Sequence, residues 1–248
     1  MHAKWNWMSW RRCGLAALAV LMTACATPVA HQQELAASER ARIRKVALLR
    51  VAEPQRMGVV DLGAIKGGGL AGGLIGAAIM GNVTDKRSKE FVDAIKTRKI
   101  RLGVALAESI QKELRGAGYT VKYLATENPK FAPDGKSDDY SHIQTDADAI
   151  LNVWYDTTGY VAPAMGEEYR PWLNLKARLL DARTKQVLYY QEFSLGMPRK
   201  AERVDHLEAE GPYRYGSFDA LMAKVDEAAE GLRKNQERVA LRLAQQIR

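Results

Sequence analysis

Cysteine is almost absent from this chain of 248 residues, and its two copies, Cys13 and Cys25, both lie near the N-terminus. Residues 26–248 therefore contain no thiol, which excludes disulfide bonds and thiolate metal sites from that part of the chain. Its folded state must depend on a hydrophobic core instead. A chain of this length is sufficient for one sizeable domain.

Long apolar runs are also lacking in the N-terminal region. The run from Cys13 to Met22 is shorter than the roughly 20 residues that a helix needs to cross a membrane. It follows Lys4, Arg11 and Arg12, and no acidic residue precedes it. A basic start, a short apolar run and small residues after it predict a secretory signal peptide over residues 1–24.

The end of this signal, Leu21-Met-Thr-Ala-Cys25, resembles the lipobox of bacterial lipoproteins. The resemblance implies a diacylglyceryl group on the Cys25 sulfur, cleavage after Ala24, and a further acyl chain such as palmitate on the new amine. Two or more acyl chains anchor a protein stably to a membrane. The sorting rule of these lipoproteins disfavours the inner membrane when Ala26, not aspartate, follows the lipidated cysteine. The implied location is therefore the periplasmic side of the outer membrane. The alternative is an ordinary cleaved signal with a chance cysteine.

The basic surplus points to anionic partners, although export removes nucleic acid from consideration. The formal charge is +8, and it falls to +5 when Lys4, Arg11 and Arg12 leave with the signal. Anionic phospholipid head groups, lipopolysaccharide and an acidic protein face are the partners to consider. Because no run of four or more basic residues occurs, we expect the surplus to be scattered over a solvated surface.

Apolar periodicity predicts the secondary structure. Six segments are typical of strands: residues 45–51, 57–62, 119–124, 148–161, 173–179 and 187–193. The last two are predicted to form a hairpin around a turn at residues 181–185. A helix is expected over residues 88–116, ended by Gly116 or Gly118, and a long C-terminal helix with Ser217 as its N-cap. Residues 126–146 and 196–216 are polar and are expected to be loops.

This order of elements predicts an α/β fold, a two-layer sandwich with a mixed sheet of about five strands and two main helices. Residues 25–43 are expected to be a lipidated tether, and residues 44–248 a single domain with a Gly-rich apolar insert at residues 63–84. Lys45-Val-Ala-Leu-Leu-Arg-Val51, Leu114-Arg-Gly-Ala-Gly-Tyr119 and the hairpin around Asp181-Ala-Arg-Thr-Lys185 resemble envelope lipoproteins related to curli-secretion lipoproteins and the N-terminal domain of TolB. That resemblance implies an accessory role in the envelope. The paired membrane hairpins of the secretion lipoproteins have no counterpart here.

The Gly-rich insert is the most unusual segment. Gly68, Gly72 and Gly76 are spaced by four, so in a helix they share one face and allow a partner backbone to approach closely. The stretch resembles the glycine-zipper segments of bacterial envelope lipoproteins, which implies membrane association or self-association. The alternative is an apolar loop, because each glycine disfavours a helix in water by about 1 kcal/mol. The stretch also matches Gly-x-Gly-x-x-Gly at residues 67–72, but the glycine run continues too far for a dinucleotide site and export removes the cofactor, so no cofactor is expected.

No catalytic motif is evident in the sequence. Four acids surround His142, but they lack the alternation and central glycine of a calcium loop, and Ser141 lacks a nucleophile-elbow pattern. We expect these to be solvated loop charges: Asp138, Asp139, Asp146 and Asp148. Aromatic residues crowd the hairpin region, where a core role is favoured over a binding platform: Trp154, Tyr155, Tyr160, Tyr169 and Trp172.

These observations predict a non-enzymatic, membrane-anchored envelope lipoprotein that acts by contact with other envelope proteins or components in assembly, secretion or integrity. Two alternatives remain open at this point. One is an oligomeric membrane-associating lipoprotein built on the glycine-zipper segment. The other is an enzyme that acts on an envelope polymer, for which the sequence offers no metal site and no identifiable catalytic set.

Overall fold

A seven-stranded mixed sheet forms the centre of the part of the chain that the computed structural model describes, which is residues 32–62, 86–135, 137–164, 167–196, 203–209 and 211–248. Cys25, the three spaced glycines Gly68, Gly72 and Gly76, and the predicted insert at residues 63–84 all lie outside the described residues. What the sequence predicts for them stays a prediction.

The main order of the sheet is β3-β1-β6-β7-β8-β9, and β2 also pairs with β6. The strands are β1 (Lys45–Leu49), β2 (Met57–Asp61), β3 (Thr120–Leu124), β6 (Ala149–Ala162), β7 (Arg170–Asp181), β8 (Val187–Leu195) and β9 (Val204–Leu207). The predicted mixed sheet is confirmed, with more strands than the five expected. The additional strand β9 lies in the stretch 196–216 that was predicted as loop, since four residues are too few to show a clear period.

The long strand β6 organises the sheet because it pairs with three others. Its first residues pair in parallel with β1, and its last five pair in parallel with β2. Since β7 runs antiparallel along the whole of its other edge, β1 and β2 follow one another along a single edge of β6. A bulge between Tyr155 and Thr157 divides the strand.

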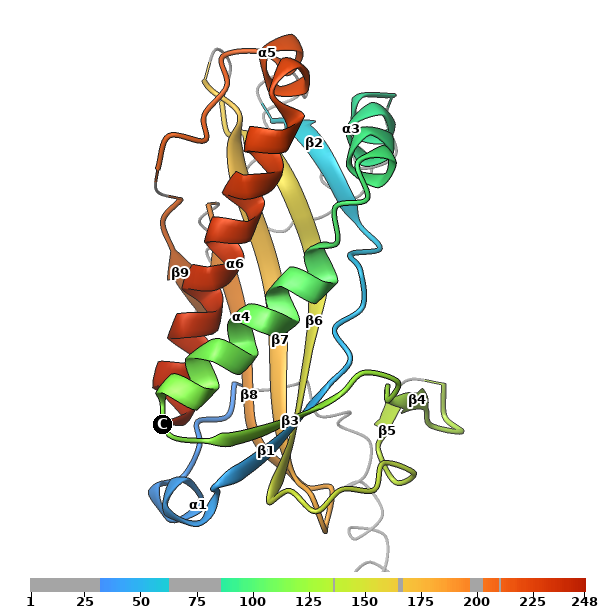
Figure 1. The fold of residues 1–248 in the computed structure, drawn as a ribbon, viewed down its shortest axis with the longest axis vertical. Coiled ribbons are helices and arrows are strands. Elements are labelled where there is room, and N and C mark those ends of the chain that lie inside the picture. Colours follow the sequence, from blue (N-terminus) through green and yellow to red (C-terminus); the bar gives the residue numbers. More distant parts are fainter. Residues whose placement is uncertain (1–31, 63–85, 136, 165–166, 197–202, 210) are drawn as a thin grey trace, which may run out of the picture. The chain divides into compact units, whose positions relative to one another are not determined.

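Two helices cover one face of the sheet, as the two-layer prediction requires (Figure 1). These are α4 (Leu102–Gly116) and α6 (Val225–Ile247). Both are amphipathic, and their apolar stripes bury Leu106, Ile110 and Leu243 against sheet residues such as Leu151 and Leu175. Burial of this apolar surface is the main force that holds the two layers together.

The helix predicted over residues 88–116 is two helices in the structure. Helix α3 (Lys86–Thr97) ends where Lys99 takes a left-handed φ of 55°, and Ile100 donates its N–H to the carbonyl of Ile95. This is a Schellman termination without its usual glycine, which explains why the sequence pattern misses it. By contrast α4 ends as predicted, and Gly118, at φ 97°, supplies the left-handed residue.

The long C-terminal helix is also divided. Ser217 is the N-cap of α5 (Phe218–Ala223), and its hydroxyl accepts the N–H of Ala220, which confirms the predicted cap. The chain then leaves helical geometry at Lys224 before α6 begins. Leu221 of α5 and Val225 of α6 pack in the same core cluster on either side of this break.

The described end of the predicted tether packs onto the domain. Residue Gln33 exchanges two backbone hydrogen bonds with Tyr190 of β8, and Leu35 and Ile43 are buried in the main core. Between them lies the short helix α1 (Ala37–Arg42). In residues 32–43 the structure thus differs from a free tether, because two apolar side chains there find places in the core.

The loop between β3 and β6 partly covers the other face of the sheet. It contains a small hairpin of β4 (Lys130–Phe131) and β5 (Asp138–Asp139). The side chains of Tyr140 and Ile143 pack on Leu49 and Ile150. Among the described helices, none is both long and apolar enough to cross a membrane.

Candidate functional site

The side chains around His142, which the sequence analysis considered as catalytic or metal-binding candidates, make local contacts. Asp139 accepts hydrogen bonds from the N–H and the hydroxyl of Ser141, at 2.8 and 3.0 Å, and these lower the pKa of its carboxyl. His142 Nε2 lies 3.0 Å from the carbonyl oxygen of Asn128, and its buried Nδ1 has no hydrogen-bond partner in the described part of the chain. Ser141 therefore points to a carboxylate and not to an imidazole base. The arrangement resembles a turn more than a nucleophile-base pair.

Two of the other three acids, Asp146 and Asp148, fix strand ends. Asp148 Oδ2 accepts the N–H groups of Lys45 and Arg44, both at 2.8 Å, and these hydrogen bonds lower the pKa of Asp148. Asp146 accepts a hydrogen bond from Lys122 Nζ at 2.9 Å, which lowers its pKa likewise. The two carboxylates join the start of β6 to β1 and β3. Their placement is explained by the sheet alone.

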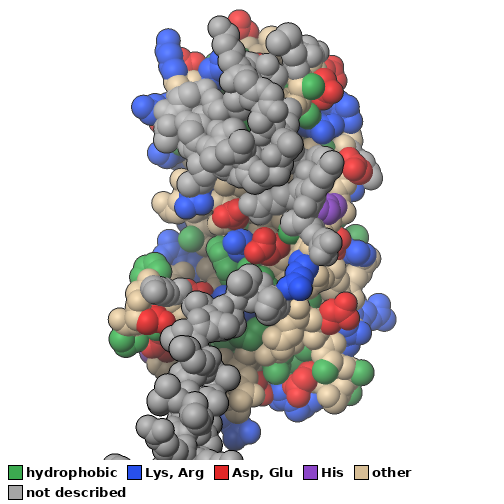
Figure 2. All heavy atoms as spheres, turned by 180° about the vertical axis from the view of Figure 1, so that it is seen from behind, with side chains coloured by type: hydrophobic (Ala, Val, Ile, Leu, Met, Phe, Trp, Pro, Cys, Tyr) green, Lys and Arg blue, Asp and Glu red, His purple; other side chains and the backbone are tan. Residues whose placement is uncertain are grey.

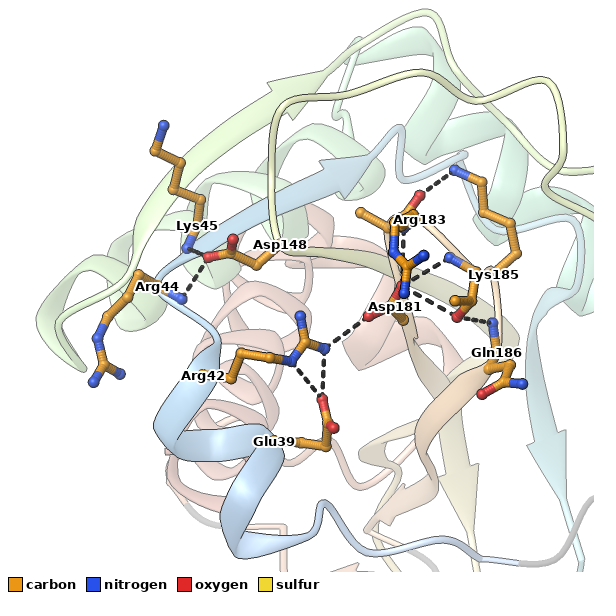
Figure 3. Close-up of polar contacts among 11 residues, drawn as sticks. Glu39, Arg42, Arg44, Lys45, Asp148, Asp181, Arg183, Lys185 and Gln186 are labelled. Atoms are coloured by element: carbon orange, nitrogen blue, oxygen red, sulfur yellow. Dashed lines mark hydrogen bonds and ion pairs between the residues drawn. The ribbon is translucent and has the colours of Figure 1, made fainter.

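A polar network lies at this end of the sheet (Figure 3). The Arg42 guanidinium bridges Glu39 and Asp181, and Asp181 also accepts the N–H groups of Arg183 and Thr184 in the β7–β8 turn. Nearby, Lys185 Nζ donates to two carbonyl oxygens, those of Ile143 and Ala182, and its burial lowers the pKa of the ammonium group.

An open pocket of about 460 Å³ lies beside this network, lined in part by Glu39, Arg42 and Asp181. Five charged residues line it, of which Glu39, Arg42 and Asp181 are paired with one another and Asp148 accepts two backbone N–H groups, so the pocket offers a ligand few uncommitted charges. We interpret the network as a structural one that holds α1 and the start of β6 against the β7–β8 turn.

A second cluster, called the Arg178 cluster here, surrounds the guanidinium of Arg178. It comprises Asp138, Tyr140, Trp154, Arg178 and Tyr190. Arg178 Nη1 lies 2.8 Å from Asp138 Oδ2 and 3.1 Å from the Tyr140 hydroxyl. Its guanidinium carbon lies 5.4 Å from the ring centre of Trp154, 5.7 Å from that of Tyr190 and 5.9 Å from that of Tyr140. One cation is thus framed by three rings and neutralised by one carboxylate.

The Arg178 cluster lies on the sheet face opposite α4 and α6. The neighbours of Arg178 in β7, Ala177 and Leu179, pack in the core under the helices, and side chains alternate between faces along a strand. Figure 2 views the molecule from that side, and basic, acidic and hydrophobic side chains are interspersed where described residues are visible. The Arg178 side chain keeps 20% of its surface exposed.

The chemistry of this cluster favours recognition over catalysis. Burial raises the pKa of Tyr140 and of Tyr190, so both stay neutral phenols at physiological pH. Arginine, tryptophan and tyrosine are the residue types that carry most binding energy at protein interfaces. A half-buried guanidinium paired to a carboxylate supplies no nucleophile and no group that titrates near neutrality.

The aromatic residues of the hairpin region divide between two roles. Tyr160, Tyr169 and Trp172 are buried core residues, as the sequence favoured. Trp154 belongs to the Arg178 cluster, whereas the Tyr155 hydroxyl donates to the carbonyl of Leu102. Neither Arg178 nor Tyr190 was predicted from the sequence to belong to a site. The available signal was a positive charge in the middle of an alternating strand, which has to face away from the core.

In the described ranges, no three His, Cys, Asp or Glu side chains lie together as a metal site would need. The resolved pKa shifts of carboxyl groups are downward, and those of tyrosines are upward, to about 12 for Tyr215 through burial. Both directions lead away from neutral pH, where acid-base catalysts operate.

Comparison with known proteins gives no family. No protein-family model and no curated protein matches the chain. Solved structures with some similarity include a PelC dodecamer from Paraburkholderia phytofirmans, at 13% identity over 64% of this chain and 72% of that one, with a TM-score of 0.29. Protein XCC0632 from Xanthomonas campestris is 12% identical over 88% and 85%, with a TM-score of 0.37.

A third solved structure, lipoprotein GNA1162 from Neisseria meningitidis, is 14% identical over 60% of this chain and 81% of that one, with a TM-score of 0.30. At such identities and TM-scores these likenesses do not bear on the function of the chain. The functional conclusion rests on its own residues.

Proposed function

We propose that this chain is a bacterial envelope lipoprotein, anchored to the periplasmic side of the outer membrane by lipid on Cys25, that acts by contact and not by catalysis. The observation that carries the proposal is the N-terminal sequence. A basic start, a short apolar run and Leu-Met-Thr-Ala-Cys end together at Cys25. Lipid attachment there would hold the domain at a membrane without a spanning helix.

The contact role has support in how the polar side chains are used. Asp139, Asp146 and Asp148 each accept hydrogen bonds that shape a loop or join strands. The Arg178 cluster, in contrast, has a partly exposed cation and a partly exposed Trp154 ring on the face away from the helices, above the buried rings of Tyr140 and Tyr190. We propose that this cluster contributes to the surface that meets another envelope protein.

The anchoring step is tested with two cysteine variants and metabolic labelling by a palmitate analogue. Cys25→Ala is expected to abolish labelling and to leave the unprocessed precursor, because the acceptor sulfur is lost. Cys13→Ala is the matched control, since Cys13 lies inside the predicted signal and should be dispensable for lipidation. Normal labelling of Cys25→Ala would refute the lipoprotein assignment.

The contact step is tested by cross-linking in membranes and affinity purification of the lipidated protein. Trp154→Ala combined with Arg178→Gln is expected to lose cross-linked partners, since it removes one ring and the framed charge. Lys112→Gln combined with Arg115→Gln, on α4, is the control for an equal number of surface changes. If the same proteins are recovered from both variants, the Arg178 cluster is not the contact surface.

A second candidate, self-association through the Gly-rich segment, has support in the spacing of Gly68, Gly72 and Gly76. Gly72→Leu would block close backbone approach and is expected to reduce membrane-bound oligomers in a cross-linking assay. Ala78→Leu adds the same side chain away from that face at 100° per residue and serves as control. Equal oligomer yields from both variants would favour an apolar loop.

A further inference from the structure

The basic surplus of the chain is concentrated on α3 and the turn after it. Residues 86–101 hold seven basic and two acidic side chains, a net charge of +5. Residues 25–248 also carry +5, because three of the eight surplus positive charges lie in residues 1–24. The rest of the processed chain is therefore neutral on balance. The chain has no run of four basic residues, yet this 16-residue stretch accounts for the whole surplus. The basic residues are Lys86, Arg87, Lys89, Lys96, Arg98, Lys99 and Arg101.

The orientation of α3 is fixed by its buried side. Phe91 and Ile95 are buried in a core cluster that also contains Met57 and Val59 of β2. The Ser88 hydroxyl lies 3.0 Å from the N–H of Val59 and accepts its hydrogen bond. Helix α3 lies beside β2 at one end of the sheet (Figure 1). The opposite side of the helix consequently faces outward.

Four of the basic side chains have no ion pair with any described residue: Lys89, Lys96, Lys99 and Arg101. All four residues are exposed. Arg98 pairs with Asp226 at 3.2 Å, and Lys86 lies 3.8 Å from Glu90. The remaining Arg87 guanidinium lies over the Phe218 ring and donates to the Tyr169 hydroxyl.

An open pocket of about 470 Å³ lies between α3 and residues 53–57, and Lys89, Val92 and Lys96 contribute to its lining. Two acids line it as well. Glu53 is committed to the N-terminus of α4, where it accepts the N–H of Gly103 at 3.0 Å, and Asp93 lies between the two lysines in sequence. Within the pocket the two lysines and the two acids balance, so the net positive charge of this surface comes from residues 86–101 as a whole.

We propose that this surface of α3 and the following turn binds an anionic phospholipid bilayer. Four exposed cations, two on α3 and two in the turn after it, fit a field of phosphates better than a single ligand does. The uncharged sequence of residues 67–84 ends just before α3 begins, and basic clusters next to apolar segments are typical of chains that meet a bilayer surface. The inference rests on the envelope location proposed above.

The test uses the unlipidated processed chain, residues 26–248, which contains the compact unit Gln32–Arg248. Its binding to vesicles of phosphatidylcholine alone is compared with binding to vesicles that also contain phosphatidylglycerol, by co-sedimentation. Each basic residue near an anionic surface strengthens binding about fivefold. The triple variant Lys89→Gln, Lys96→Gln and Lys99→Gln should therefore bind the anionic vesicles about a hundredfold more weakly. Binding of the unaltered chain should also fall as salt shortens the screening length.

The control variant carries the same charge change elsewhere: Lys112→Gln, Lys130→Gln and Lys234→Gln. It should keep most of the binding, and circular dichroism should show that both variants are folded, because all six side chains lie on the surface. Absence of binding to anionic vesicles, or equal losses in both variants, would overturn the proposal and leave an acidic protein as the partner of α3. The outcome is independent of acyl labelling at Cys25, so failure here is distinguishable from failure of the lipoprotein assignment.

Discussion

Gly159 permits the pairing of β2 with β6. Its φ is +146°, and it lies directly opposite Gly58 of β2. A Cβ at this position would lie 1.8 Å from the Gly58 carbonyl oxygen, far inside contact distance. The substitution Gly159→Ala should therefore detach or distort β2 and lower the free energy of unfolding by about 3 kcal/mol or more. Urea unfolding followed by circular dichroism measures the effect.

The matched control for this change is Gly116→Ala. Gly116 is the last residue of α4, and a Cβ there would meet no atom within 4 Å. Because alanine favours a helix over glycine, the control should be as stable as the original chain or more stable by about 0.5 kcal/mol. A Gly159→Ala protein with unchanged stability would show that β2 does not approach β6 as described.

Asp148 gives the chain a pH dependence at the residue scale. Hydrogen bonds from Lys45 and Arg44 lower the folded-state pKa of Asp148 below its unfolded value near 3.9. The carboxylate thus contributes stability that is present above about pH 4 to 5 and is lost as the pH falls through the lowered folded pKa. Solvent screens this exposed group, so we expect a contribution of about 1 kcal/mol or less.

Two variants separate charge from hydrogen bonding at Asp148. Asp148→Asn keeps an acceptor oxygen and should lose stability at pH 7 but not in acid, where the native carboxyl is also neutral. Asp148→Ala removes the acceptor and should be less stable at both pH values, because two backbone N–H groups lose their partner. Thermal melts at pH 7 and about pH 3 provide the comparison. A constant deficit of Asp148→Asn across that range would contradict the linkage.

At the scale of elements, only one side of α6 packs against the sheet, and two leucines in its last turns differ accordingly. Leu243 is 2% exposed and packs in the main core, whereas Leu241 is 46% exposed. Leu243→Ala should lower the free energy of unfolding by about 2–5 kcal/mol, because it leaves a cavity beneath the helix. Leu241→Ala is expected to change it by less than about 0.5 kcal/mol. Similar losses from both would mean that α6 does not present this side to the sheet.

The helix breaks show what local pattern cannot predict at this scale. Apolar residues continue at helical spacing through residues 88–116, so periodicity alone indicates one helix. The chain instead turns at Lys99, because α3 packs on β2 whereas α4 packs across the main sheet. Helix α4 lies close to Val51, the segment that follows β1. Gly103 is the residue that allows this, because a Cβ there would lie 2.7 Å from the Val51 carbonyl oxygen.

At the scale of the whole molecule, a contact function and a catalytic function predict opposite effects of substitutions in the loop around His142. We expect His142→Ala combined with Asp139→Ala to leave the envelope phenotype intact, because these side chains make turn contacts and no catalytic pair. Release of the domain by Cys25→Ser behind a cleavable signal should disturb that phenotype. The measurement is complementation of a deletion strain, with immunoblotting of membrane fractions to verify folding and location. Loss of function in a correctly localised double variant would support the enzyme alternative.

Much of this protein is determined by the sequence alone, because it depends on neighbours along the chain. The strand and helix periods, the β7–β8 hairpin and the Ser217 cap all follow from residues within a few positions of one another, and the predicted export signal rests on the same kind of local pattern. Only the tertiary structure decides which distant segments meet. It places β1 and β2 on one edge of β6, adds β9 beside β8, and brings Asp138, Trp154 and Tyr190 around Arg178. Sheet register sets these contacts through backbone hydrogen bonds between remote residues, and local composition carries no record of the partner.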